Sequence, residues 1–406
     1  MTQPYKIKYI QNKVKFGILI DWDAVRREYK KLKIPKEYHY PLKADFGRVG
    51  YVIDMSDRSR GKTTNKLIVG LLLYAMYGIQ LHYVRQKSSQ CEPKMLRDLY
   101  KTVLENNYIS KIFGERWNSI MYRGKRWYLV RLDEDGKIEE KDDTHCTICL
   151  GLDEADDLKS IYNAPRGDMI FYDEFISSRM EFNDFVWFSD LCKTIIRSRM
   201  SPVIFMSANT INRNSRWFDE YAIRDTVQQM QAGDTTEVTS PLGTHFYIEI
   251  LTPDTSEERQ QVNRRFFGFK NTRLDAITGR NTWAEESYQH IPPEPAEDEP
   301  QVKMLINRIF LELHGQWVKL AVVKDPRIGI CVYVMPATRI YQDSVIFTAD
   351  DIRDKRYVFG FGKGYPVNFI WGLFTEGKFY YAHNAAGCFV ASYVTYAQTK
   401  IRHMTK

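Results

Sequence analysis

Long apolar runs are missing from this sequence of 406 residues, and none is long enough to span a bilayer. The first residues also lack the apolar core of a secretion signal, so we expect a cytosolic protein without membrane contact. Cysteine is sparse, with six residues scattered along the chain, and no disulfide framework is predicted. Cys146 and Cys149 form a C-x-x-C pair that has no second pair, so we interpret them as structural rather than zinc-binding or redox-active.

What is present is an ordinary globular composition, with 44% hydrophobic and 27% charged residues, and a length that suits two or three domains. The net charge of +7 suits an anionic partner. The basic excess is strong at the start, where residues 1–45 contain eleven Lys and Arg against five acids. A helix is expected over residues 22–32. It is either part of an arm that faces nucleic acid or a solvated basic helix.

The most informative stretch is residues 56–64, which follows an apolar, β-rich run over residues 49–55 and precedes a helical pattern over residues 65–76. Strand, turn and helix in this order are the context of a phosphate-binding P-loop, whose backbone N–H groups and helix dipole attract phosphate. Lys62 is then expected to reach the β- and γ-phosphates, and the hydroxyl of Thr63 to ligate Mg²⁺.

One glycine of the usual P-loop pattern is absent, because Ser56 stands at its first position. Serine is small, so the backbone can still approach a phosphate. Arg58 lies inside the loop, close enough to act on the γ-phosphate of the same subunit. The alternative is a solvated basic turn before a core helix. The expected nucleotide contacts in this loop are Ser56, Arg58, Ser59, Arg60, Gly61, Lys62, Thr63 and Thr64.

A P-loop also needs a carboxylate that positions the metal at the end of a neighbouring strand, and hydrolysis needs a base for water. Two acidic stretches compete for these roles. Asp173 and Glu174 follow the apolar run of residues 169–172, whereas residues 153–156 spell a helicase-like Asp-Glu-Ala-Asp.

The spacing to the next strand favours Asp173 and Glu174. After them come one helical stretch, residues 183–197, and one buried apolar run, residues 203–206, that leads to Asn209. From the helicase-like tetrapeptide an extra strand would intervene. We therefore predict that Asp173 holds Mg²⁺, that Glu174 orients and deprotonates the attacking water, and that Asn209 contacts the γ-phosphate.

Short apolar strands alternate with helices from about residue 45, as in a mainly parallel α/β sheet. Further strands are expected over residues 79–85, 117–132 and 144–152, and a helix over residues 95–105. After about residue 250 the chain becomes polar, then rich in proline and acids, then β-rich. We predict a basic arm (1–44), a P-loop domain (45–253), a linker domain (254–300) and a β-rich tail domain (301–406).

Taken in order, these motifs resemble a viral DNA-packaging ATPase of the terminase large-subunit class. They are most similar to the encapsidation ATPase of small, protein-primed phi-twenty-nine-like phages. The resemblance covers residues 45–250 well and the tail loosely. It is carried by the P-loop with Arg58 and Gly61-Lys62-Thr63, by Tyr83-Val84-Arg85, by residues 170–176 around Asp173-Glu174, and by Ile196-Arg197-Ser198-Arg199 before residues 204–209.

The resemblance implies an ATPase domain of the additional-strand P-loop type that uses ATP and Mg²⁺, a small helical linker domain and an RNase H-like, vestigial nuclease C-terminal domain. It also implies a homopentameric ring in the host cytoplasm, docked on the portal of an empty capsid, with double-stranded DNA, the portal protein and a packaging RNA as partners. Arg197 is then the arginine that acts on a neighbouring subunit. From the residues alone, Arg197 and Arg199 are helix-end charges that satisfy the helix dipole.

Two other functions are compatible with the motifs: a helicase or remodelling ATPase that acts on nucleic acid, and a structural nucleic-acid-binding protein with a silent P-loop. We do not expect nuclease activity from the tail. Such activity needs several clustered carboxylates that hold two metal ions. The tail contains Glu312 in its first strand and Asp350, Asp351 and Asp354 in one later segment, which does not resemble acids that converge from separate strands.

Overall fold

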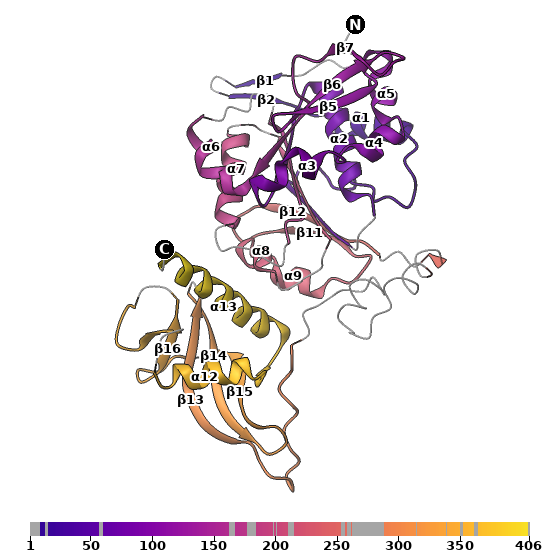
Figure 1. Cartoon of the computed structure of the whole chain (residues 1–406). Helices are drawn as coiled ribbons and strands as arrows, with labels where there is room; N and C mark the ends of the chain where they lie inside the picture. The colour runs from indigo at the N-terminus through magenta and orange to yellow at the C-terminus, as the bar shows by residue number, and fades with distance from the viewer. Residues whose placement is uncertain are drawn as a thin grey trace. The chain divides into compact units, whose positions relative to one another are not determined.

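The computed structural model describes residues 9–12, 15–56, 60–161, 167–176, 184–197, 199, 201–209, 215–252, 256, 257, 261, 288–313, 315–337, 339–349, 352–360 and 364–404. The chain forms two compact units, Met1–Ala284 and Glu285–Lys406, which are described separately (Figure 1). No helix in the described ranges has the length and apolar character needed to cross a membrane.

The first unit is built on one large sheet, which has ten strands in the described part of the chain. In spatial order it contains β11 (Thr235–Thr239), β12 (His245–Ile250), β3 (Tyr51–Met55), β10 (Val203–Ala208), β9 (Met169–Asp173), β4 (Leu81–Arg85), β8 (Thr147–Gly151), β6 (Arg126–Leu132) and β5 (Ser119–Arg123), with β7 (Ile138–Lys141) paired to β6. The strands from β12 to β8 run parallel, and the outer pairs are antiparallel. The predicted α/β fold with a mainly parallel sheet is thus confirmed.

Helices cover both faces of this sheet, which explains why the central strands are apolar throughout. In β9, Met169 and Phe171 belong to the apolar cluster on one face, and Ile170 and Tyr172 to the cluster on the other face. The helices include α1 (Trp22–Lys31), α2 (Lys62–Tyr77), α3 (Pro93–Leu96), α4 (Lys101–Glu105), α5 (Tyr108–Phe113), α6 (Ala155–Ile161), α7 (Asp184–Ile196), α8 (Arg216–Glu220) and α9 (Arg224–Gln229). A separate hairpin pairs β1 (Tyr9–Asn12) with β2 (Lys15–Ile18).

The basic segment at the start of the chain contributes to the core of the first unit. In α1, Trp22, Val25 and Tyr29 are buried in the same apolar cluster as α2, while Lys30 and Lys31 are exposed. The helix is amphipathic, with its basic residues on the solvent side. Its apolar face joins it to the sheet domain.

Two local expectations differ from the structure. The helix expected over residues 95–105 is broken into α3 and α4, because a turn directs Tyr100 into the core, where its hydroxyl lies 2.6 Å from Thr147 Oγ1. Strand β7 was not expected, because its four residues are all exposed and lack an alternating apolar pattern.

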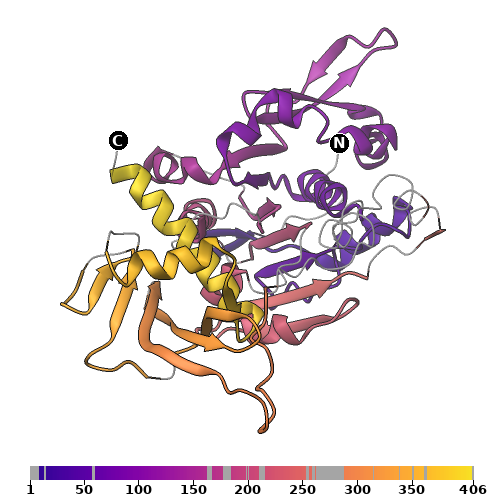
Figure 2. The same ribbon diagram turned by 60° about the horizontal axis from the view of Figure 1, so that its bottom comes forward.

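The described residues of the second unit form a six-stranded sheet covered on one face by two helices (Figure 1, Figure 2). Val367 and Ile370 of α12, and Val390 and Tyr393 of α13, share one apolar cluster with the sheet. The six strands agree with the expectation of a β-rich tail, whereas the long helix α13 was not predicted. The order is β17 (Tyr357–Phe359), β16 (Val345–Thr348), β13 (Lys303–Leu313), β14 (Gln316–Asp325), β15 (Gly329–Pro336) and β18 (Phe379–Tyr381), with α12 (Val367–Thr375) and α13 (Asn384–Met404).

Two of the four acids considered in the tail, Glu312 and Asp354, lie in described segments. Strand β13 pairs with β16, so the buried Glu312 lies beside Thr348, whose Oγ1 donates to Glu312 Oε2 over 3.0 Å. The other carboxylate oxygen of Glu312 is 3.5 Å from Arg353 Nη2. Asp350 and Asp351 lie outside the described residues, and Asp354 is paired with Arg356. The absence of nuclease activity therefore stays a prediction.

Acid should destabilise the first unit through a buried histidine in β4. Burial lowers the pKa of His82 to about 3, whereas the unfolded chain titrates near 6.5. Between these values the unfolded state binds more protons, so the free energy of unfolding falls as the pH falls. The variant His82→Asn, which keeps an N–H for the Gln80 carbonyl, should lose stability less steeply, by up to about 1.4 kcal/mol per pH unit below the unfolded pKa. Urea unfolding from about pH 7 to about pH 5 measures both slopes, and equal slopes would contradict this account.

Candidate nucleotide-binding site

The start of α2 has the geometry of a phosphate-binding turn. Gly61 precedes the helix with φ +65°, a left-handed conformation that favours glycine. A Cβ atom at Gly61 would also lie 2.6 Å from Cγ of Tyr38. Lys62 is the first helical residue, and its Nζ contacts the hydroxyl of Ser56. The serine that replaces the usual glycine therefore holds the P-loop lysine.

A cavity of about 510 Å³ lies in front of this turn. It brings together seven residues that the sequence predicted: Arg60, Gly61, Lys62, Thr63, Thr64, Glu174 and Asn209. Two further residues line the cavity. Thr102, from α4, was not predicted, and Tyr38, from the segment before β3, was suggested by the sequence only as a candidate adenine contact, together with Tyr40. Arg58 and Ser59 lie outside the described residues. An aromatic residue shortly before the P-loop was the only signal in the sequence for Tyr38.

The side chains of Thr63 and Asp173 are in contact, an arrangement that suits a magnesium site. Thr63 Oγ1 donates to Asp173 Oδ2 over 3.0 Å, and the hydroxyl of Tyr83 donates to the same oxygen over 2.9 Å. Burial raises the pKa of Asp173, while Arg85 acts in the opposite direction. A hydroxyl and a carboxylate are hard oxygen ligands, and Mg²⁺ is commonly bound by one or two protein oxygens together with waters and phosphates. This donor pair therefore fits Mg²⁺.

Glu174 is held on both sides by side chains from neighbouring strand ends. Arg85 Nη2, at the end of β4, donates to Glu174 Oε2 over 2.7 Å, and Asn209 Nδ2 donates to Oε1 over 2.9 Å. Glu174 has φ +58°, a sparsely populated conformation for a residue with a side chain. Arg85 was expected only as part of a family motif, and the structure adds it to the site.

The helicase-like tetrapeptide lies elsewhere. Asp153 accepts hydrogen bonds from the backbone N–H of Ser88 over 2.7 Å and from its hydroxyl over 3.0 Å. Glu154 is paired with Lys125 and accepts from the N–H of Gly151. None of these residues lines the described cavity in front of α2. These acids cap local turns.

The two arginines after α7 differ in their surroundings. Arg199 Nε is 3.3 Å from the buried carboxylate of Asp168, and Nη1 donates to the carbonyl of Ile196 over 3.1 Å. Arg197 is exposed, has φ +49°, and donates from Nε to the carbonyl of Thr194 over 3.3 Å. Arg197 does not line the described cavity of its own chain.

No protein-family model and no curated protein matches the sequence. Among solved structures, the Phi-28 gp11 DNA packaging motor matches with a TM-score of 0.56 and 15% identity over 89% of this chain and 98% of that chain. The bacteriophage Phi-29 viral genome packaging motor assembly matches with a TM-score of 0.56 and 16% identity over 89% of this chain and 100% of that chain. The chain has the fold of a phage DNA-packaging motor protein. The resemblance predicted from the motifs is thereby confirmed for the fold.

The contact between Gly61 and Tyr38 yields a stability test. Gly61→Ala combines the left-handed backbone penalty, about 1–2 kcal/mol, with a clash against the Tyr38 ring. Gly78→Ala is the matched control, because Gly78 ends the same helix with φ +69° and has open space around its Cβ position. We expect Gly61→Ala to lower the free energy of unfolding more than Gly78→Ala, and Tyr38→Ala to remove the difference. If both glycine variants are equally destabilised, Tyr38 does not pack on the turn.

Proposed function

We propose that this protein is an ATPase motor that translocates double-stranded viral DNA into an empty capsid, working as a ring on the portal. One observation carries the proposal. Lys62, Thr63 and Glu174 line the same cavity, and Thr63 contacts Asp173, in a chain with a packaging-motor fold. Strand β10 lies between β3 and β9, which supports an additional-strand P-loop domain.

The roles of the residues follow from their positions. Lys62 leaves Ser56 to contact the phosphates, while the N–H groups at the start of α2 surround them. Mg²⁺, bound between Thr63 and Asp173, would neutralise charge on the β- and γ-phosphate oxygens. Glu174 orients the attacking water and accepts its proton. Arg85 and Asn209 keep the Glu174 carboxylate at the end of the cavity.

The assembly around this site is also proposed. Arg197 supplies positive charge to the γ-phosphate of a neighbouring subunit in a homopentamer, and Arg58 does so within its own subunit. Contacts to double-stranded DNA go mainly to phosphates, since a motor must ignore sequence. The portal protein and a packaging RNA are the further partners, on a procapsid in the host cytoplasm. The predicted linker domain, residues 254–300, lies mostly outside the described residues. Residues 301–406 are proposed to form an RNase H-like domain without nuclease activity.

The catalytic glutamate is tested against the helicase-like acids. Glu174→Gln should bind ATP and lower kcat by about 10²–10⁴-fold, because the amide cannot take a proton from water. Glu154→Gln is the matched control and should hydrolyse ATP like wild type. ATPase assays, and packaging of DNA into empty capsids with ATP, measure the effect. Wild-type rates for Glu174→Gln would refute the assignment, and strand separation of naked DNA would favour a helicase.

The neighbouring-subunit role of Arg197 is tested by mixing variants. Arg197→Ala should bind ATP but hydrolyse it about 10³–10⁵-fold more slowly, as for arginine fingers in other phosphoryl-transfer enzymes. Mixing Arg197→Ala with Glu174→Ala should restore some turnover, because a subunit with intact Glu174 can receive Arg197 from the other variant. If dilute monomer hydrolyses ATP as fast as the assembled ring, Arg197 is only a helix-end charge.

A further inference from the structure

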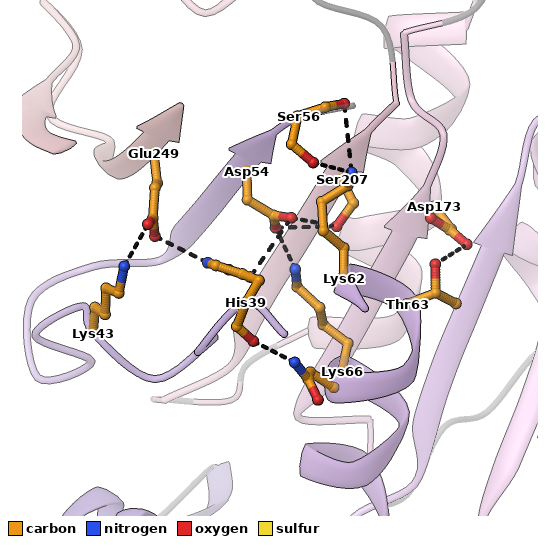
Figure 3. A network of polar contacts seen from close by, with 11 residues as sticks. His39, Lys43, Asp54, Ser56, Lys62, Thr63, Lys66, Asp173, Ser207 and Glu249 are labelled. Carbon is orange, nitrogen blue, oxygen red and sulfur yellow. Dashed lines mark hydrogen bonds and ion pairs between the residues drawn. The ribbon is translucent and has the colours of Figure 1, made fainter. Parts of the chain in front are cut away.

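Four polar residues lie side by side across the central strands. Ser207 of β10 is the register partner of both Asp54 in β3 and Asp173 in β9, and Glu249 of β12 is the register partner of Asp54. Register partners in parallel strands share one face of a sheet. Glu249, Asp54, Ser207 and Asp173, here called the polar row, therefore share the face of the sheet on which α2 packs (Figure 3).

Helix α2 is attached to the polar row at two points, one turn apart. Thr63 Oγ1 donates to Asp173, and Lys66 Nζ lies 2.5 Å from Asp54 Oδ1. Asp54 and Lys66 are both fully buried, and Ser207 Oγ lies 3.0 Å from each oxygen of Asp54. Burial raises the pKa of Asp54, but Lys66 and its other cationic neighbours outweigh burial, so the pKa is lowered and the carboxylate stays ionised.

The partners of the three carboxylates in the polar row differ in kind. Glu249 is paired with Lys43 and with His39, and Asp54 with Lys66. Asp173 instead accepts from two hydroxyl groups, while the nearest atom of Arg85 is 3.6 Å away and that arginine contacts Glu174 more closely. Lys43 and Lys66 thus neutralise Glu249 and Asp54. Asp173, which accepts from hydroxyl groups, can bind a metal cation.

A buried ion pair is a weak source of stability, because desolvation offsets the attraction between its charges. Replacing such a pair by apolar residues is often neutral or stabilising, so stability alone does not account for Asp54 and Lys66. The pair instead fixes the position of a helix, because it holds the first turns of α2 on β3 and β10. Thr63 lies one turn before Lys66 on the same side of the helix.

We propose that Asp54 and Lys66 are positioning residues for the divalent cation. By locking α2 to the polar row, they place Thr63 Oγ1 and the Asp173 carboxylate where one Mg²⁺ can bind both. The inference rests on the proposed nucleotide site. It assigns a role to two side chains that are not among the lining residues of the described cavity.

The test replaces the buried pair by apolar residues of similar size, Asp54→Val with Lys66→Met, in the full-length chain. Outer partners of metal ligands typically contribute about 10–100-fold to metal affinity. The Mg²⁺ concentration for half-maximal tightening of a fluorescent ATP analogue should rise by about that factor, while binding of the analogue in EDTA stays at the wild-type level. The control pair, Glu249→Gln with Lys43→Met, keeps an acceptor for His39 and should leave the Mg²⁺ requirement unchanged.

Several outcomes overturn the inference. An unchanged Mg²⁺ requirement in the Asp54/Lys66 variant removes the positioning role. If the Mg²⁺ requirement rises equally in the Glu249/Lys43 control, the effect comes from general loosening of the sheet and not from the Asp54–Lys66 pair. If the first variant does not fold, Asp54→Asn with Lys66→Met keeps the shape of the aspartate and must show the same rise. Failure of the wild-type chain to bind the analogue contradicts the proposed function itself, and so is distinguishable from failure of the positioning role.

Discussion

Charge at the ends of the central strands is the constraint on which the first unit depends. Three carboxylates, Glu249 of β12, Asp54 of β3 and Asp173 of β9, lie on the same face of the sheet, and all three are buried. Buried carboxylates require partners, because an uncompensated charge in a core costs several kcal/mol. The partners come from α2, from β4 and from the segment before β3, so the packing that neutralises these carboxylates also positions residues of the cavity.

The segment before β3 shows how this constraint shapes the cavity. His39 pairs with Glu249 through its ring, and its backbone N–H donates to the carbonyl of Arg60 over 2.9 Å. Asn65 of α2 donates to the carbonyl of His39. These bonds hold the segment against the end of the phosphate-binding turn and the first turn of α2. Tyr38, the preceding residue, is thereby fixed as a wall of the cavity.

Sequence reasoning succeeded where a local pattern carried the information. Paired acids after a run of bulky apolar residues indicated β9 and its end, and the same argument rejected residues 153–156 because the interval to the next strand was wrong. Sequence reasoning was less informative for α1. The many basic residues of this segment obscured the pattern of its apolar face, which packs with α2. Sequence reasoning also missed α13, because aromatic and β-branched residues are common to strands and buried helices.

The sequence by itself determined the strand–turn–helix around Lys62 and the strand that ends at Asp173, because each rests on residues close together in the chain. Only the tertiary structure decided which distant side chains complete them. His39 and Glu249 are 210 residues apart, and Arg85 and Glu174 are 89 apart. Such contacts depend on strand order and register, and neither can be deduced from the pattern of neighbouring residues in the sequence.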